Sequence, residues 1–262
     1  MDQNELSAAL VGLPLGGLRF FSTIGSTNDE ALQWSAEGAS DLSLVVADEQ
    51  TAGRGRAGRR WHTPPGAALA FSLILRPWPD EKSYPARLTG LAALALVDCC
   101  GRMGLEAQIK WPNDVLLRGR KTAGILVEST WGGNTLDAAV LGVGVNVVAA
   151  AVPPAELLSF PATCLEAALG RPVRRAELLR DILAALLAWR SRIGSDEFLG
   201  AWEASLAYRG GQVFVGQDEA EPLAGTLLGL ERDGSLRLAA NDKPVVVHFG
   251  QIHLRPMDDK MS

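Results

Sequence analysis

Arginine and glycine are concentrated in one short stretch of the chain, between Gln50 and Trp61. The eight residues 53–60 read GRGRAGRR and include four arginines and three glycines. Glycines let a backbone approach a ligand closely, and guanidinium groups present planar pairs of donors that fit carboxylates and phosphates. The stretch is typical of a loop that closes over an acyl phosphate. A solvated basic loop, or one that binds RNA nonspecifically, has the same composition.

Three further segments have residue types suited to a ligand pocket. The segment 110–114 (KWPND) follows a predicted strand, and its Pro, Asn and Asp favour either a plain β-turn or a turn that faces a pocket. Lys121 begins a strand whose small residues, 122–124, could form a slot for a flat ring. Gly142 and Gly144 lie on one face of a strand, where either a ligand or a closely packed helix would fit.

The segment 26–30 (STNDE) precedes a predicted helix. Ser26 with Asp29, or Thr27 with Glu30, has the spacing of a capping box, a role with which ligand contact is compatible.

Composition excludes several other classes of protein. Three histidines are too scattered for a metal site, and three cysteines fit neither a metal-ligand spacing nor a paired disulfide framework, so we expect no metal centre and a reducing, cytoplasmic location. No apolar run approaches the roughly 20 residues that span a membrane. The net charge of −5 gives no reason to expect tight binding to DNA or RNA.

The elements that would position these residues alternate irregularly, which favours an α+β fold. Strands are predicted at 18–24, 42–50, 68–77, 107–111, 121–130 and 137–147, and helices at 29–38, 84–104 and 174–194. From residue 208 the pattern changes to short strands, at 212–216, 224–231, 235–240 and 244–250. We therefore predict two domains, 1–207 and a small β-barrel at 208–262.

Five motifs, GSTNDEA, EQTAGRGRAGRRW, KWPNDV, RKTAGILVE and GVGVNV, occur in the order and spacing of biotin protein ligases, which the chain closely resembles. They cover roughly residues 25–147. The resemblance implies a catalytic domain related to class II aminoacyl-tRNA synthetases, with a mixed, largely antiparallel sheet and helices on one face. It also implies an SH3-like barrel at the C-terminus.

The resemblance also implies a reaction. Biotin and Mg²⁺-ATP would form biotinyl-5′-adenylate, whose acyl group then passes to a lysine of a biotin carboxyl carrier protein of acetyl-CoA or acyl-CoA carboxylase. By the same resemblance, the ureido group of biotin would contact Ser26, Thr27, Asn28 and Gln50. The walls of its pocket would be Gly53, Gly124, Leu126, Gly142 and Gly144.

The remaining roles implied by the family concern the nucleotide and the reacting groups. Lys121 and the stretch Arg54-Gly55-Arg56 would hold the acyl carboxylate and the α-phosphate, and Lys110 would reach phosphate oxygens. Trp61 would cover the adenine or the closed loop, with a core role as the alternative, and Asn113 and Asn146 would bind the adenine or ribose. We expect the Gly/Arg loop to be mobile in the free enzyme and to become ordered when biotin and ATP bind.

Three other functions compete with this one. A lipoyl or octanoyl ligase would share the fold and chemistry, a nonenzymatic nucleic-acid binder would use the arginines of the loop, and a biotin-binding protein would lack the cations. About 17 residues precede the first predicted strand, so we do not expect the DNA-binding domain and repressor function that some biotin ligases have. Monomer and weak homodimer both remain open.

Overall fold

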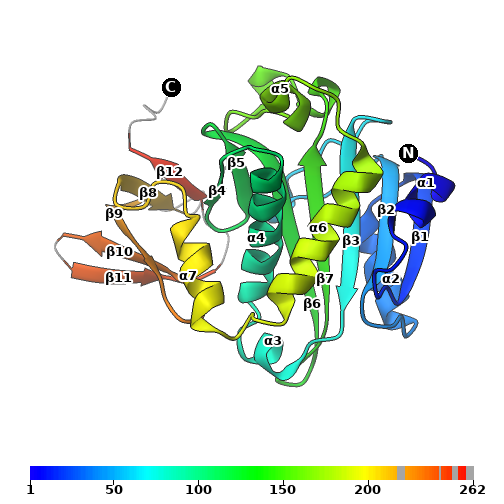
Figure 1. Ribbon diagram of the computed structural model, residues 1–262. Coiled ribbons are helices and arrows are strands. Elements are labelled where there is room, and N and C mark those ends of the chain that lie inside the picture. Colours follow the sequence, from blue (N-terminus) through cyan, green and yellow to red (C-terminus); the bar gives the residue numbers. More distant parts are fainter. Residues whose placement is uncertain (217–221, 242, 250–252, 258–262) are drawn as a thin grey trace.

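A seven-stranded sheet with the order β1-β2-β3-β7-β6-β5-β4 forms the centre of the protein (Figure 1). The structure is a computed structural model that describes residues 1–216, 222–241, 243–249 and 253–257. The strands of the large sheet are β1 (Gly17–Ile24), β2 (Ser43–Gln50), β3 (Ala68–Leu75), β4 (Ala107–Lys110), β5 (Asp114–Leu117), β6 (Arg120–Gly132) and β7 (Thr135–Asn146).

Six predicted strands of this sheet are confirmed, and a seventh was missed. The structure adds β5, which pairs with both β4 and β6. The sequence predicted a turn at 110–114 and no strand after it. β5 shows no alternation of polar and apolar residues, because Asp114 is followed by three apolar residues. β1 and β2 are parallel, and the other neighbouring strands of the sheet are antiparallel, which confirms the mixed, largely antiparallel sheet.

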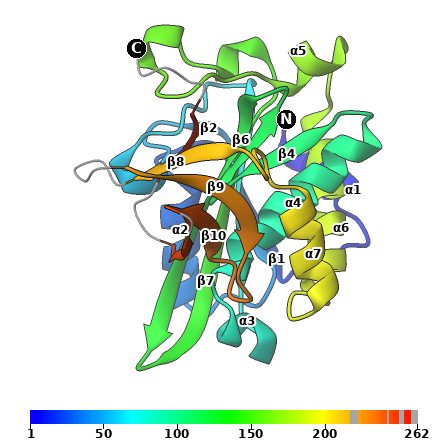
Figure 2. The same ribbon diagram turned by 90° about the vertical axis from the view of Figure 1, so that its left-hand side faces the viewer.

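Helices cover both faces of the sheet, whereas the sequence analysis expected them on one (Figure 2). The helices are α1 (Gln3–Ala9), α2 (Thr27–Ala36), α3 (Pro79–Ser83), α4 (Arg87–Arg102), α5 (Leu165–Leu169), α6 (Arg175–Arg190) and α7 (Asp196–Ala204). Alternate side chains of each strand point to opposite faces. Leu73 and Leu141 belong to the main core on the side of α4 and α6, whereas Ile74 and Val140 pack in a separate cluster with Ala31 of α2. The face of α2 is also the face of Gly142 and Gly144.

The C-terminal part forms the predicted small β unit. Its strands are β8 (Gln212–Gly216), β9 (Leu223–Leu230), β10 (Leu236–Ala240), β11 (Lys243–Val247) and β12 (His253–Pro256), and they form an antiparallel sheet of order β11-β10-β9-β8-β12. Gly250, the last residue of the predicted strand 244–250, lies outside the described residues.

Aromatic residues join this small sheet to the rest of the chain. The Trp111 ring lies 5.0 Å from that of Phe249, and its indole nitrogen donates to the Gly234 carbonyl at 3.1 Å. The fully buried Trp202 of α7 lies 6.3 Å from the same Phe249 ring. These contacts place the small sheet next to β4, although the boundary at 207/208 stays a prediction. Among the described helices, none is long and apolar enough to cross a membrane.

Candidate active site

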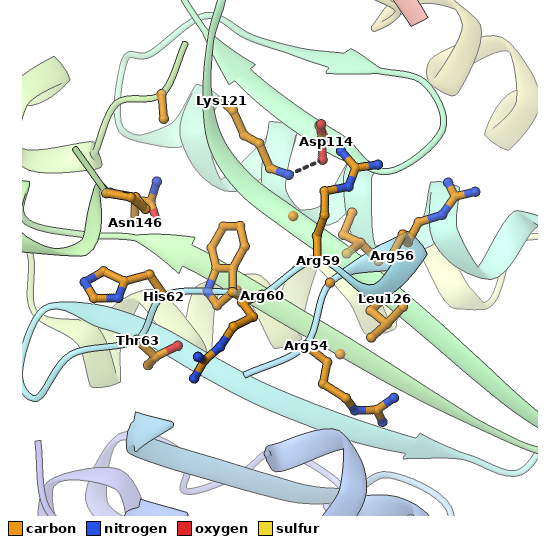
Figure 3. A pocket seen from close by; sticks show the side chains of 18 of the residues that line it. Arg54, Arg56, Arg59, Arg60, His62, Thr63, Asp114, Lys121, Leu126 and Asn146 are labelled. Carbon is orange, nitrogen blue, oxygen red and sulfur yellow. Dashed lines mark ion pairs between the residues drawn. The ribbon is translucent and has the colours of Figure 1, made fainter. Parts of the chain in front are cut away.

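A cavity of about 840 Å³ opens where the Gly/Arg loop passes over the sheet (Figure 3). Of the described residues that the sequence analysis assigned to a site, every one except Gly53 lines this cavity. They are Ser26, Thr27, Asn28, Gln50, Arg54, Gly55, Arg56, Trp61, Lys110, Asn113, Lys121, Gly124, Leu126, Gly142, Gly144 and Asn146. Gly53 is set back from the cavity, where a side chain would collide with the Trp61 carbonyl.

Polar side chains at the start of α2 and the end of β2 form one end of the cavity. Gln50 Oε1 accepts from the backbone N–H of Thr27 at 2.8 Å and from its hydroxyl at 3.1 Å. The Ser72 hydroxyl, fully buried on β3, contacts Thr27 Oγ1 at 2.8 Å and donates to Asn28 Oδ1 at 2.6 Å. This network fixes the orientation of the Asn28 amide, and we refer to Thr27, Asn28 and Gln50 as the polar end.

The capping box predicted for α2 is wrong. In the described structure the Ser26 side chain makes no capping hydrogen bond, although Ser26 is the N-cap residue directly before the helix. The Gln50 side chain, at the end of β2, accepts the hydrogen bond from the backbone N–H of Thr27 instead. A long-range partner thus replaces the local one, which frees Ser26 to line the cavity.

Two glycines form a flat floor in the middle of the cavity. The pairing of β5, β6 and β7 places Asp114, Gly124 and Gly144 opposite one another in a row across the sheet. A side chain at Gly144 would collide with the Trp61 indole, and one at Gly124 would lie 3.0 Å from it. We call Gly124 and Gly144 the glycine shelf. Trp61 lies on this shelf, so the space that the sequence analysis reserved for a ligand is shared with a ring of the protein itself.

Gly142 leaves space for a different side chain from the one that lies at Gly144. A side chain there would collide with the Asn28 amide. The missing side chain therefore admits Asn28 to the sheet, where its Nδ2 donates to the Leu126 carbonyl at 3.3 Å.

Two lysines meet one carboxylate at the other end of the shelf. Lys121 Nζ lies 2.6 Å from Asp114 Oδ1, and Lys110 Nζ lies 3.6 Å from Asp114 Oδ2 (Figure 3 shows the first pair). Burial raises the pKa of Asp114, but Lys121 and Lys110 outweigh burial and hold this pKa below its usual value. Asp114 is therefore ionised at neutral pH and holds both ammonium groups at the cavity.

Lys110 is largely buried, with 8% of its surface exposed. Burial lowers its pKa, and Asp114 opposes this shift. Its Nζ lies 4.4 Å from the centre of the Phe160 ring, whose negative face attracts a cation. The ammonium is therefore held between a carboxylate and an aromatic ring.

Arg56 lies near the two lysines, and Arg54 does not. Arg56 Nη1 donates to Asn113 Oδ1 at 3.2 Å, and burial lowers its pKa while Asp114 opposes the shift. Arg54 instead contacts Glu128 and Asp29, and in Figure 3 it points away from Lys121. The structure thus separates two arginines that the sequence analysis grouped.

Several residues of this site were not assigned by sequence reasoning. Asp114 stands inside the quoted KWPND motif, and Glu128 ends the quoted RKTAGILVE motif, so a signal was available for both. Ser72 and Phe160 lie in an ordinary apolar strand and a loop, where no local pattern marks them. Within the described part of the chain, no group of three or more His, Cys, Asp or Glu could hold a metal ion.

Comparison with known proteins places the chain among ligases that act on acyl cofactors. The model of the Biotin/lipoate A/B protein ligase family matches residues 20–146. The biotin--[acetyl-CoA-carboxylase] ligase of Paracoccus denitrificans is 39% identical over 223 residues, which cover 81% of this chain and 90% of the relative. The corresponding ligase of Mycobacterium tuberculosis is 32% identical over 266 residues, which cover 97% and 96% of the two chains.

The fold agrees with these relatives. A biotin protein ligase of Aquifex aeolicus, solved in complex with biotin and ATP, superposes with a TM-score of 0.79 at 27% identity, over 92% of this chain and 99% of that one. The chain belongs to the biotin protein ligase family.

Proposed function

We propose that this protein forms biotinyl-5′-AMP and pyrophosphate from biotin and ATP, and then transfers the biotinyl group to a lysine of a biotin carboxyl carrier protein. The observation that carries the proposal is the order of groups along β7. Asn28 of the polar end lies at Gly142, and Trp61 lies at Gly144. Lys121 lies at Gly124, which pairs with Gly144, and Asn146 lies two residues further along β7. A ligand with a polar ring, an acyl carboxylate and a nucleotide fits this order.

The polar end suits the ureido ring of biotin. This ring presents one carbonyl acceptor and two N–H donors, and Thr27, Asn28 and Gln50 offer hydroxyl and amide groups that complement them. The side chains are already oriented by hydrogen bonds to one another and to Ser72, so their ordering precedes ligand binding.

The cationic end suits the reaction at phosphorus. A carboxylate that attacks the α-phosphorus of ATP meets a negative polyphosphate, so fixed positive charge must offset the repulsion. An ammonium group has three N–H donors, so Lys121 can keep its contact with Asp114 and still donate to the incoming carboxylate or phosphate. Lys110 and Arg56 add charge on the side of the departing phosphates.

Mg²⁺ would enter with the nucleotide. Magnesium is usually bound by one or two carboxylates together with substrate phosphates. Asp114 is a cavity-lining carboxylate close to the two lysines, and it is already paired with both. The described residues thus do not form a metal site of their own, and we derive no step through the ion.

Transfer to the carrier requires no covalent enzyme intermediate. The amine of the carrier lysine attacks the acyl carbon of the adenylate, an amide bond forms, and AMP leaves. Asp114, ionised and at the reacting end, holds the two lysines in place during this step. We place the reaction in the cytoplasm, a proposal supported by Cys99, Cys100 and Cys164, which are free and buried.

The test measures biotin-dependent pyrophosphate release from ATP, with lipoate in place of biotin as the control for the other acid of this family. Wild type is compared with Lys121→Ala and with Lys82→Ala, which removes an exposed lysine of α3. A biotin carrier domain is then added and its biotinylation followed. We expect release with biotin, its loss in Lys121→Ala alone, and transfer to the carrier. Release with lipoate and not with biotin would reject the proposal.

A further inference from the structure

We infer that Glu128 and Asp29 form a latch for Arg54, and that Arg54 acts by holding the Gly/Arg loop (residues 51–61) over the cavity rather than by touching the reacting groups. We call Arg54, Glu128 and Asp29 the loop latch. This inference rests on the proposed function, because it assigns a positioning role within the same site.

The geometry of the latch is that of a guanidinium between two carboxylates. Arg54 Nη1 donates to Glu128 Oε1 at 2.8 Å, and Arg54 Nη2 lies 2.7 Å from Asp29 Oδ1. The hydrogen bond to Glu128 is the largest contribution to a raised pKa of Arg54, with burial opposing it. The positive charge is therefore compensated locally by two negative ones, and little of it remains for a substrate anion.

The latch connects the loop to the polar end. Asn28 Nδ2 donates to Glu128 Oε2 at 2.8 Å, so the same carboxylate binds the loop arginine and the amide proposed to recognise biotin. Asn28 and Asp29 are neighbours at the start of α2. Displacing the loop would thus remove the arginine that holds Glu128, and Glu128 is a partner that orients Asn28.

The latch also controls where Trp61 lies. Arg54 pairs with Arg60 across the loop in an antiparallel bridge, and the Trp61 N–H donates to the Gly53 carbonyl at 2.9 Å. Fixing Arg54 to Glu128 therefore fixes both arms of the loop, and with them the indole on the glycine shelf. A substitution at Glu128 should therefore alter the positions of side chains at both ends of the cavity.

Glu128 is consequently a positioning residue for both the loop and Asn28. The side chains of the latch are partly exposed, at 36% for Arg54, 26% for Glu128 and 60% for Asp29. Solvent weakens each ion pair, so removing the charge of Glu128 should change the equilibrium between the closed and the open loop by about fivefold rather than by orders of magnitude.

The test is a double-mutant cycle with two readouts. Arg54→Ala, Glu128→Gln and the double variant are compared with wild type, and Glu30→Gln is the matched control, since it breaks the Arg19–Glu30 pair of 2.7 Å on the same helix as Asp29. The first readout is trypsin cleavage of the ligand-free protein after residues 56, 59 and 60, followed by mass spectrometry. The second is KM for biotin against kcat in pyrophosphate release.

A latch predicts that cleavage within the loop is about fivefold faster in Glu128→Gln, and unchanged in Glu30→Gln. KM for biotin should rise by a similar factor while kcat changes less. The double variant should match Arg54→Ala in loop cleavage, because the two residues hold the loop through one contact.

Multiplying effects on cleavage in the double variant would overturn the inference, since they would mean that Glu128 and Arg54 hold the loop through separate contacts. Unchanged cleavage in Glu128→Gln would also overturn it. Cleavage needs no ligand, so a protein without biotin-dependent activity would refute the proposed function and still decide the latch.

Discussion

Replacing Gly144 with alanine tests the contact between Trp61 and the glycine shelf. The new methyl carbon would lie 2.8 Å from the indole Cζ2 and closer still to Cε2 and Nε1, whereas ordinary contacts begin at 3.4 Å. The ring must therefore move by at least 0.6 Å (3.4 minus 2.8 Å), and by more for the two nearer atoms. Because Gly144 is paired on both sides in the sheet, we expect the loop and Trp61 to move, and the strand to stay.

The cost of this displacement can be bounded. Overpacking a well-packed site costs about 1–3 kcal/mol. If this cost falls on closure of the loop over biotin and ATP, adenylation efficiency should drop by about 5- to 150-fold. Gly124→Ala should have a smaller effect, since its methyl carbon would lie 3.0 Å from the ring.

The assay is biotin-dependent pyrophosphate exchange, with urea unfolding to show that the fold is retained. Gly101→Ala is the control, because a methyl group there would meet no described atom within 4 Å apart from its chain neighbours and the backbone of its own helix. The decisive comparison repeats Gly144→Ala in a Trp61→Ala background, where the clash is absent and the alanine should have little further effect. An equal loss in both backgrounds would refute the reasoning, because the methyl group would then act on the ligand itself.

Three further predictions concern the charged end of the cavity and the loop. The adenylation rate should fall as pH rises through the pKa of Lys110, which burial lowers from 10.5. Phe160→Leu should shift this fall to lower pH because the ring favours the charged ammonium, and identical rate–pH profiles would argue against the contact. Asp114 has a pKa below its usual value of 3.8 in the folded state, so its carboxylate stabilises the folded state above pH 3.8 and loses this contribution as pH falls through the lower value. The free energies of unfolding of wild type and Asp114→Asn, measured in urea, should therefore converge at low pH, and a constant difference would contradict the assignment. Biotin with ATP should slow trypsin cleavage in the loop 51–61, and equal cleavage rates with and without ligands would disprove the predicted ordering.

Local patterns in the sequence were sufficient to predict most of the strands. Glycine and proline mark backbone requirements that depend on few residues, and apolar periodicity marks the long strands and helices. The Gly/Arg loop, KWPND and the glycine strand each had a purely structural interpretation as well, and only the family resemblance implied that they line one site. The five motifs in order also identified the family, which the comparisons confirm.

Partners far apart along the chain could be identified only from the tertiary structure. Arg54 and Glu128 are separated by 74 positions, and Asn28 and Glu128 by 100, so no local pattern reveals that one carboxylate serves both. The same holds for the hydrogen bond from Thr27, at the start of α2, to Gln50, and for the indole on the glycine shelf, which depends on strand register. The sequence by itself determined the family and which of these residues lie on strands and loops, because both follow from the order of residues along the chain. Only the tertiary structure decided how their charges pair, because pairing depends on distances across the sheet.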